Sequence, residues 1–354
     1  MKKIRLGFFV PELTNCGPIN VVSEIIKHLD KNIFDIMMIV VRKHDLKYEE
    51  YANNIIRNCN LDCVFLDNKN IKETLNSISA NLDIVHLHGL YPAKYARFFK
   101  RNVKIVATIH NTFFRDYISA YGLIKGGFGA LIHLYYLNVN RVEFLVGCSD
   151  VVSNIIKKFT FRSQIIKTIH NGVDINRFYP LSNELIQTQR KKLGFNEKDV
   201  LCIFSGALIR RKRVPELIEW FKENSESNYK LVILGEGEEL NECKKIASEN
   251  VIFLGFKSNP EIYYQISDFV VSMSSAEGYP MSIIEAVASG CYALLSPNES
   301  HLEFISYNQK QATLIENFNK KLIKERIFDN YPLSSFLMTK KYTDFYKLMI
   351  ENKI

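Results

Sequence analysis

The sequence predicts a protein of two α/β domains in series, each built on a doubly wound parallel sheet. Its 354 residues suit two domains of about 100 to 200 residues each. Short apolar runs alternate with longer amphipathic runs, and the pattern restarts after a polar bridge at residues 181–199. Continuously apolar strands are typical of parallel sheets that helices cover on both faces. We therefore expect two similar sheets, each with its ligand-binding loops at the carboxyl ends of the strands.

The first half supplies the strands of the first sheet, and most of these runs end in polar or glycine residues. An amphipathic helix is expected at residues 19–29, INVVSEIIKHL, between the first two strands. The expected strands are IRLGFFV (4–10), FDIMMIVV (34–41), DIVHLHG (83–89), VKIVATIH (103–110), FLVGCSD (144–150) and IIKTIHNG (165–172).

The second half repeats this alternation. Helices are expected at VPELIEWFKENS (214–225) and NECKKIASEN (241–250). The expected strands are VLCIFSGAL (200–208), YKLVILGEGEEL (229–240), VIFLGF (251–256), FVVSMSSAEG (269–278) and CYALLS (291–296). Because ligands of such sheets bind at the strands' carboxyl ends, the expected site is a cleft between the two domains.

Composition excludes several protein classes. Hydrophobic residues make up 47% and charged residues 24%, ordinary proportions for a globular protein. The seven cysteines lack CxxC spacing, which argues against a disulfide framework and a zinc site and favours a reducing cytoplasm. The short apolar run at the start stops at Pro11 without a cleavage signal, so export is not expected. No stretch reaches the roughly 20 apolar residues of a membrane span.

The net charge of +8 favours an anionic partner. KYARFFKRNVK (94–104) alternates basic and aromatic residues, and it is either a solvated helix end or a patch that contacts an anionic membrane. GLIKGGFGALIHLYYLNV (122–139) is either a core helix or a mobile apolar lip at an acceptor site.

Two carboxylates, Glu277 and Glu285, lie on either side of a Gly-Tyr-Pro turn in SAEGYPMSIIEAVASG (275–290). Pro280 suits the first turn of a helix because it lacks the N–H that would be unpaired there, so a helix should begin near Pro280 or Met281. The amides of residues 278–282 would form a positive helix end suited to phosphate. Glu285 would lie roughly 7 Å along the axis, within reach of hydroxyls beyond the phosphate. The arrangement suits a nucleotide sugar, although either carboxylate alone is easily explained as a helix-end residue.

These motifs give the chain a resemblance to the family-4 retaining glycosyltransferases (glycosyl transferases group 1) over nearly its whole length. EGYPMSIIEA resembles the family's EGxP...EA signature, and IHNGVDINRF (169–178) resembles its NGVD...F segment at the interdomain link. DIVHLHG, VATIHN and FLVGCSD resemble strands of the acceptor domain. SGALIRRKRVPEL (205–217) resembles the G-R-L-x-x-x-K-G segment.

The resemblance implies an α/β GT-B fold of two Rossmann-like domains. Residues 1–176 would bind the acceptor and residues 177–334 the donor, while the helix of 335–354 would pack back on the first domain. It implies that Glu285 binds the ribose hydroxyls and that Glu277 contacts the donor sugar. Lys212 and Arg211 would neutralise the leaving diphosphate, which agrees with their position beyond a strand.

The remaining expected donor-site residues follow from the same resemblance. Gly278, Tyr279, Pro280, Met281 and Ser282 would present the anion-binding turn, and Gly206, Gly235, Gly17 and Asn171 would line the donor pocket. For Gly17 and for Asn171, a plain turn is the competing interpretation. His110, at the end of VKIVATIH, matches the position that faces the donor sugar, so Glu277, His110 and Lys212 are the expected catalytic residues. His86 and His88 are expected to face opposite sides of their strand, with one of them in the core.

The sequence departs from the family pattern at two positions near the lysine. Ala207 replaces the usual arginine, and Arg213 replaces the glycine that follows the lysine. Arg210, Arg211 or Arg213 would then supply the second cation.

The expected activity is retaining hexosyl transfer from a nucleotide-diphosphate sugar, a UDP-sugar, to a glycan or lipid-linked acceptor. The product would be a bacterial surface polysaccharide such as an O-antigen, a capsule or a wall polymer. No cofactor or metal is expected, because no Asp-x-Asp occurs in the chain, and no nucleic acid is expected as a partner. The expected location is the cytoplasm, at the inner face of the membrane. A nucleotide-sugar epimerase of the same architecture and a non-catalytic glycan-binding scaffold remain as alternatives.

Overall fold

The computed structural model describes residues 2–59, 61–67, 69–160, 164–318 and 331–352. The chain divides into two compact units. Unit 1 comprises Met1–Gly172 and Ser335–Ile354, and unit 2 comprises Val173–Ser334. The division falls inside the segment that resembles the interdomain link. Within the described ranges, no helix combines the length and apolarity needed to cross a membrane.

Unit 1 is built on a seven-stranded sheet in which all pairs are parallel, in the order β3-β2-β1-β4-β5-β6-β7. Leu6 of β1 pairs with Ile36 on one side and with Ile84 on the other, so β1 lies inside the sheet. The direction of strand order reverses between β1 and β4, where such sheets bind ligands. The strands are β1 (Ile4–Val10), β2 (Phe34–Val40), β3 (Asp62–Phe65), β4 (Ile84–His88), β5 (Lys104–Ile109), β6 (Phe144–Gly147) and β7 (Ile165–Thr168).

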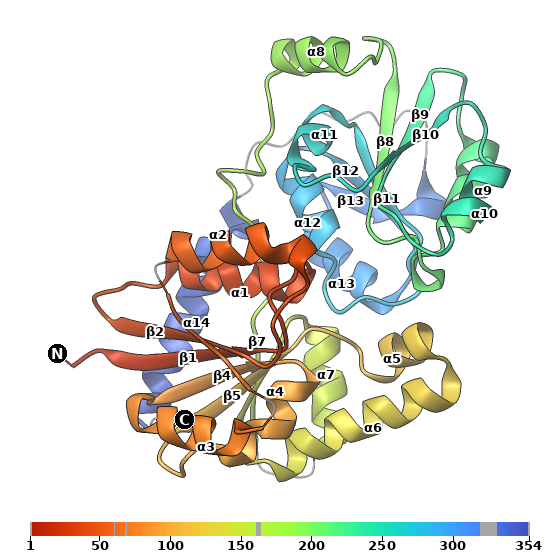
Figure 1. The fold of residues 1–354 in the computed structure, drawn as a ribbon. Helices are drawn as coiled ribbons and strands as arrows, with labels where there is room; N and C mark the ends of the chain where they lie inside the picture. The colour runs from red at the N-terminus through yellow and green to blue at the C-terminus, as the bar shows by residue number, and fades with distance from the viewer. Residues whose placement is uncertain (1, 60, 68, 161–163, 319–330, 353–354) are drawn as a thin grey trace. The chain divides into compact units, whose positions relative to one another are not determined.

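Helices lie on both faces of this sheet (Figure 1). Their starts follow local chemistry: Pro18 lies in the first turn of α1, and the Ser149 side chain caps α7 by accepting from the Val152 amide. The helices are α1 (Gly17–His28), α2 (Glu49–Cys59), α3 (Ile71–Ile78), α4 (Leu90–Tyr95), α5 (Phe114–Tyr121), α6 (Leu123–Val139), α7 (Asp150–Phe159) and α14 (Ser335–Ile350). Short 3₁₀ turns are η1 (Leu46–Tyr48), η2 (Ser79–Asn81) and η3 (Ala96–Phe98).

The C-terminal helix α14 is part of the core of unit 1. Its Tyr342 and Tyr346 are fully buried. The Tyr346 hydroxyl lies 2.6 Å from Nδ1 of His86 on β4, and Ser335 at the helix start donates to Glu24 of α1 at 2.6 Å. The last described helix of the chain thus packs on the first domain's sheet.

Unit 2 repeats the design with six parallel strands in the order β10-β9-β8-β11-β12-β13. The order reverses between β8 and β11. Apolar side chains of α9 and of the strands form one core, which includes Phe221, Leu231 and Phe269. The strands are β8 (Val200–Ser205), β9 (Tyr229–Leu234), β10 (Val251–Gly255), β11 (Phe269–Ser272), β12 (Tyr292–Leu295) and β13 (Ala312–Leu314).

The helices of unit 2 include one anchored by a buried arginine. Arg190 of α8 is 4% exposed and donates to the carbonyl oxygens of Ile266 and Asp199 and to the carboxylate of Asp268. The helices are α8 (Asn183–Lys192), α9 (Val214–Asn224), α10 (Leu240–Ile246), α11 (Glu261–Ile266), α12 (Met281–Ala288) and α13 (Glu299–Tyr307). The 3₁₀ turns are η4 (Arg210–Lys212), η5 (Ile315–Asn317) and η6 (Tyr331–Leu333).

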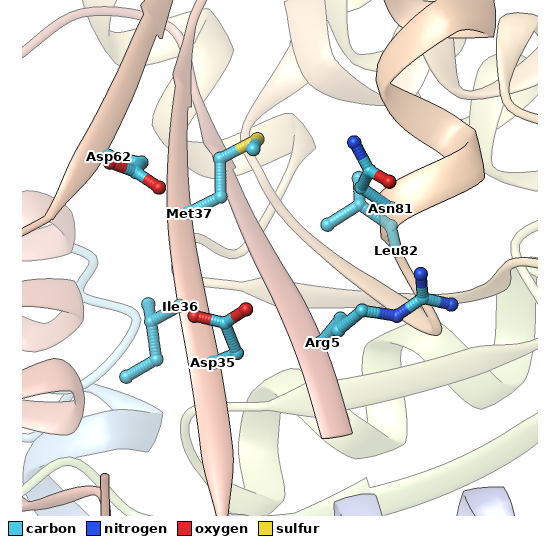
Figure 2. A pocket seen from close by; sticks show the side chains of 7 residues that line it. All are labelled: Arg5, Asp35, Ile36, Met37, Asp62, Asn81 and Leu82. Carbon is cyan, nitrogen blue, oxygen red and sulfur yellow. The ribbon is translucent and has the colours of Figure 1, made fainter. Parts of the chain in front are cut away.

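A pocket of about 230 Å³ lies at the amino ends of the first three strands (Figure 2). Arg5 and Asp83 form an ion pair at 2.7 Å beside it, so the guanidinium is already neutralised. This edge of the sheet is opposite the carboxyl ends, where parallel sheets place ligands. The pocket therefore lies at the edge of this sheet that is opposite its expected ligand-binding loops. Its lining is Arg5, Asp35, Ile36, Met37, Asp62, Asn81 and Leu82.

Candidate active site

In unit 2, charged side chains gather where the strand order reverses. Strand β8 leads through Gly206 to the cations of η4, and β11 leads to the segment that carries Glu277. The two loops are tied together, because the amide and the hydroxyl of Ser275 both donate to the carbonyl oxygen of Arg211, at 2.9 and 3.2 Å. The fold thus brings two segments more than 60 residues apart to one edge of the sheet.

Glu277 is the centre of this charge cluster. Its carboxylate accepts hydrogen bonds from Nζ of Lys212 at 2.5 Å and from Nη1 of Arg211 at 3.0 Å. The same Arg211 nitrogen also donates to the carbonyl oxygen of Ala276 at 2.5 Å. Glu277 is 8% exposed. Burial by itself would raise the pKa of this carboxyl, but attraction to Lys212 and Arg211 and the hydrogen bond from Lys212 outweigh it and lower the pKa to about 2. The cluster therefore holds two cations around one carboxylate.

The geometry distinguishes among the three arginines that could replace the one missing at Ala207. Arg211 contacts Glu277. Arg210 is exposed, and Arg213 pairs with Glu216 on the surface of α9 at 3.1 Å. Arg213 also has φ +53° and ψ +47°, a left-handed conformation that glycine adopts with less strain. The glycine of the G-R-L-x-x-x-K-G segment, which Arg213 replaces here, suits that backbone conformation.

The anion-binding turn predicted before α12 has the expected local structure. Helix α12 begins at Met281 with Pro280 as its N-cap residue, which confirms the predicted helix start. Among the described residues, no hydrogen bond is donated by the backbone amides of Met281 and Ser282. Tyr279 is 8% exposed and packs edge-on against Phe304, so it supports the turn from the core side. The helix end therefore presents amides beside the charge cluster.

Glu285 lies one turn into α12 and has a partner that the sequence did not reveal. The hydroxyl of Tyr264 on α11 donates to its Oε2 at 3.4 Å. Tyr264 is fully buried, and burial raises the pKa of its phenol well above the usual value, so the hydroxyl stays protonated. A tyrosine in a short amphipathic segment has no feature that distinguishes it from a core residue.

Ser300 is a second residue that sequence reasoning missed. Its hydroxyl, at the start of α13, donates to the carbonyl oxygens of Glu277 and Gly278 at 2.5 and 3.3 Å. Asn298, the N-cap of α13, donates to Ser274 at 2.7 Å. These contacts fix the backbone of the segment that carries Glu277. The Asn-x-Ser cap sequence at 298–300 was the available signal, since such residues favour helix starts.

The predicted glycines have a packing role in the structure. A Cβ on Gly235 would lie 1.9 Å from the carbonyl oxygen of Gly206, and one on Gly237 would lie 2.2 Å from that of Leu208. The loops after β8 and β9 can approach this closely only without side chains. The aliphatic stem of Lys212 passes near Gly206, where a Cβ would meet its Cε at 3.7 Å. Ligand contact by Gly206 and Gly235 stays a prediction.

In unit 1, the polar groups at the strand ends are neutral histidines. Nδ1 of His88 on β4 lies 2.9 Å from Nε2 of His110, which follows β5, and the two rings are stacked. Burial lowers the pKa of His110 to about 4 and that of His88 well below its usual value. His86 is fully buried between Tyr346 and Thr108, at 2.6 and 2.7 Å.

The expectation that His86 and His88 face opposite sides of their strand is wrong. Their ring centroids are 4.2 Å apart. Residues i and i+2 of a strand point to the same face of the sheet, so both rings lie on one side. His86 belongs to the core, as expected for one of the pair, and His88 contacts the candidate site residue His110.

Gly17 and Asn171, the other two predicted site residues of unit 1, both follow strands of its sheet. Gly17 opens α1. Asn171 follows β7 and is 6% exposed, and its Oδ1 has no hydrogen-bond partner among the described residues. The structure thus joins Arg211, Lys212 and Glu277 by direct contacts in unit 2, and it places Gly17, His110 and Asn171 in unit 1.

Comparison with known proteins identifies the family. The model of Glycosyltransferase Family 4 matches residues 17–177, and that of Glycosyl transferases group 1 matches residues 186–329. The chain is 25% identical over 279 residues to an alpha-monoglucosyldiacylglycerol synthase of Acholeplasma laidlawii, which covers 70% of this chain and 66% of the synthase. It is 22% identical over 313 residues to the O-antigen biosynthesis glycosyltransferase WclY of Escherichia coli, which covers 83% of this chain and 80% of WclY.

Solved structures show the same architecture. HepE of Anabaena in complex with UDP has a TM-score of 0.76 at 14% identity, covering 97% of this chain and 100% of HepE. The lipopolysaccharide glycosyltransferase WaaG has a TM-score of 0.65 at 14% identity, covering 96% of this chain and 95% of WaaG. Together with the two family models, these matches confirm the predicted fold of two parallel-sheet, Rossmann-like domains. The chain belongs to the family-4 glycosyltransferases, the glycosyl transferases group 1, with GT-B architecture.

Proposed function

We propose that this protein transfers a hexose from a nucleotide-diphosphate sugar, a UDP-sugar, to a hydroxyl of a glycan or lipid-linked acceptor, with retention at the anomeric carbon. The observation that carries the proposal is the cluster of Lys212, Arg211 and Glu277 beside the start of α12. Two cations share one carboxylate, so the cluster keeps a net positive charge. A helix N-terminus adds to that charge. Such a site suits a diphosphate.

The leaving group of the proposed reaction is a nucleotide diphosphate, whose negative charge grows as the bond to the sugar breaks. Lys212 and Arg211 are the groups that would neutralise it, together with the amides of Met281 and Ser282. Donors that are already fixed in place stabilise such charge without rearranging during the reaction. We propose that this set acts without a metal ion, since it supplies the positive charge from side chains and backbone.

Glu277 would have two consecutive roles. In the structure it holds the two cations in place, and its low pKa keeps it ionised at neutral pH. With donor bound, the diphosphate would share Lys212 and Arg211, which would free carboxylate lone pairs of Glu277 for the hydroxyls of the sugar. Glu285, held by Tyr264, would accept hydrogen bonds from the ribose hydroxyls.

The proposed acceptor unit is unit 1, with His110 facing the reacting sugar. His110 is neutral near pH 7, because burial lowers its pKa to about 4. A neutral imidazole suits a hydrogen bond to an uncharged hydroxyl. We propose front-face attack by the acceptor hydroxyl through an oxocarbenium-like state.

The names of relatives support the choice of donor and product. HepE was crystallised with UDP, with UDP and glucose, and with UDP-glucose, and WclY acts in O-antigen biosynthesis. We therefore propose a UDP-sugar donor and a bacterial surface polysaccharide as the product. Because the donor is a nucleotide sugar, we place the reaction on the cytoplasmic side of the membrane.

The test is a panel of nucleotide sugars, with binding followed by calorimetry and turnover by nucleotide release. Lys212→Ala and Glu285→Ala are compared with Lys222→Ala and Glu219→Ala, an exposed ion pair on α9 at 3.3 Å. We expect one donor to bind selectively, with binding lost in the first two variants and kept in the two controls. Circular dichroism checks that all four variants are folded.

Two outcomes would contradict the proposal. If no nucleotide sugar binds the wild-type protein, the charge cluster is a structural ion pair and unit 2 is no donor site. If the protein converts the sugar of the donor without any acceptor, the activity is that of an epimerase.

A further inference from the structure

His301 of α13 is a fully buried histidine that has one bonded and one unbonded ring nitrogen. Its exposed fraction is 0%. Nδ1 lies 3.0 Å from the carbonyl oxygen of Ser296, 3.2 Å from the hydroxyl of Ser296 and 2.8 Å from the side-chain nitrogen of Asn298. Nε2 is buried as well, and it has no hydrogen-bond partner among the residues that the structure describes. Because buried polar atoms are nearly always paired, this nitrogen needs an explanation.

The surroundings of Nδ1 fix the ring but suit either neutral tautomer. The Asn298 amide has a fixed orientation, because its oxygen accepts from the backbone amide of His301 at 2.9 Å and its nitrogen donates to the carbonyl oxygen of Ser274 at 2.7 Å. A protonated Nδ1 would donate to the carbonyl oxygen of Ser296, and an unprotonated Nδ1 would accept from the amide of Asn298. Either ring nitrogen can therefore carry the proton without a rotation of the ring.

The start of α13 is bonded to the segment that carries Glu277. Ser300, the residue before His301, donates to the carbonyl oxygens of Glu277 and Gly278 at 2.5 and 3.3 Å. Burial lowers the pKa of His301 to about 4, although attraction to Glu277 raises the pKa, and repulsion from Lys212 lowers it further. The ring is therefore neutral near pH 7, and it lies close enough to the charge cluster to interact with both charges.

Glu277 needs a new hydrogen-bond donor if its cations turn to a diphosphate. In the structure, Lys212 donates to its Oε1 and Arg211 donates to its Oε2. The carboxylate is mostly shielded from water, since Glu277 is 8% exposed, and a buried carboxylate without donors is strongly destabilising. Among the described residues of unit 2, the one buried side-chain nitrogen without a partner is Nε2 of His301.

We propose that His301 is a positioning residue, which replaces the two cations on Glu277 when the donor binds. In the ligand-free protein the proton of His301 is on Nδ1, because buried N–H groups without a partner are rarer than unpaired acceptors. With a diphosphate bound, the proton is on Nε2, which donates to one oxygen of Glu277, while Nδ1 accepts from Asn298. The ring stays neutral, since one N–H bond is lost and one is formed. The other oxygen of Glu277 stays available to a hydroxyl of the sugar.

This inference rests on the proposed function, because it takes a diphosphate as the ligand that draws the cations away. One arm of its test needs no ligand. Lys212→Ala removes the donor to Oε1 of Glu277 directly, so His301 should respond to this change in the ligand-free protein. A failure of UDP to bind would contradict the proposed function, whereas the ligand-free arm still tests the role of His301.

The first experiment records the ¹⁵N signals of the histidine rings in the full-length protein at pH 7, with UDP as the probe. We expect the proton of His301 on Nδ1 in the free wild type, and on Nε2 in the wild type with UDP and in ligand-free Lys212→Ala. His133 of unit 1 is the internal control. It is buried, its Nε2 also lacks a partner among the described residues, and burial alone lowers its pKa to about 4. Its signals should not change.

The second experiment measures the Kd of UDP by calorimetry for two amide variants. In His301→Gln the new amide nitrogen can take the place of Nε2, whereas in His301→Asn it can take only the place of Nδ1. His301→Asn should bind UDP about tenfold more weakly, the effect of one hydrogen bond to a charged group. His301→Gln should bind UDP nearly as tightly as the wild type. His133→Asn, the same change at the control histidine, should bind UDP like the wild type.

Three results would overturn the inference. The first is a proton on the same nitrogen of His301 in all three samples. The second is a Kd of His301→Asn that equals that of the wild type. The third is an equal loss of binding in His301→Asn and His301→Gln, because it would show that the ring only fills space in the core.

Discussion

The two units share one design but carry opposite chemistry where their strand order reverses. At the strand ends of unit 1, His88 and His110 are stacked and neutral. At those of unit 2, Lys212 and Arg211 surround an ionised Glu277. In a parallel sheet, ligands bind at the carboxyl ends of the strands, and the residues of the loops there determine the charge of the site. From this difference we propose that the anionic ligand binds unit 2 and that unit 1 serves an uncharged hydroxyl.

The largest expected effect comes from removing a cation in unit 2. Lys212→Ala should lower the rate of nucleotide release from the donor by about 100-fold or more, the scale seen when a fixed charge-stabilising donor is lost. His110→Ala, its counterpart in unit 1, should have a smaller effect, because a hydrogen bond to a neutral group is weaker than one to a developing charge. Steady-state kinetics of the wild type and of both variants measures the two decreases in rate, which are then compared. Equal effects would contradict the division of charge between the units.

Lowering the pH should reduce the folding stability of unit 1 before that of unit 2. Burial lowers the pKa of His86 to about 3, that of His110 and His133 to about 4, and that of His88 well below its usual value. Below pH 6.5 these four histidines bind protons in the unfolded chain but stay neutral in the folded chain. The free energy of unfolding therefore decreases as the pH falls, until the histidines of the folded chain are protonated as well. Each histidine contributes a slope of about 1.4 kcal/mol per pH unit in that window.

Unit 2 has different titrating groups at its strand ends. His301 is one buried histidine there, with a pKa of about 4. The pKa of Glu277 is about 2, so its contribution is complete above pH 4.5 and is lost as pH falls toward 2. Hydrogen exchange between pH 7 and pH 4, read peptide by peptide, should show earlier loss of protection in β4 and β5 than in β8 and β11. Simultaneous loss in both sheets would argue against this difference.

A smaller effect is expected from His88, which acts on His110 through a single hydrogen bond of 2.9 Å. Nε2 of His88 is buried without a partner among the described residues. Orphan buried N–H groups are rarer than orphan acceptors, so the proton of His88 should be on Nδ1 and should be donated to Nε2 of His110. The proton of His110 is then on its Nδ1.

His88→Phe keeps a flat ring but removes this donor. We expect kcat to fall about tenfold, the KM for the donor to stay unchanged, and the ¹⁵N signals of His110 to report a mixture of tautomers. His88→Asn, which offers an amide donor, should restore part of kcat. A change confined to the KM for the donor would show that His88 does not position His110.

The smallest expected effect comes from Arg213→Gly, which tests whether the left-handed backbone beside the cation cluster is strained. Arg213 has a left-handed conformation and a surface ion pair with Glu216, which contributes little because it is exposed. Arg213→Gly should therefore raise the free energy of unfolding by about 1 kcal/mol. Urea unfolding of this variant measures the change. A decrease would mean that the side chain of Arg213 has a role beyond this surface pair.

The apolar patterns and the helix signals of the sequence predicted most of the fold. Continuous apolar runs located the strands of both sheets, and Pro280 located the start of α12. Strands β3 and β13 were not predicted, because Asp62–Phe65 and Ala312–Leu314 are short and only partly apolar. Helix α6 was predicted either as core or as an exposed lip, and the structure shows one apolar face of each kind.

Residues of the candidate site could be predicted where one sequence motif contains them. Contacts between segments that only the fold brings together could not be predicted. Glu277 and Glu285 share one segment, so their spacing was informative. The link from Arg211 to Glu277, and the support of Glu277 by Ser300, join segments that only the sheet brings together. The two histidines of HLHG were misplaced because their spacing of two was taken as opposite faces, whereas strand geometry puts them on the same one.

The most direct test of the central claim is hydrogen exchange of the full-length protein with and without UDP. The claim is that the anionic ligand binds at the strand ends of unit 2. We expect UDP to slow exchange in residues 205–213 and 274–286 and to leave the ends of β4 and β5 unchanged, with the protection lost in Lys212→Ala and kept in Lys222→Ala. Protection at His88 and His110 without protection around Glu277 would contradict the claim.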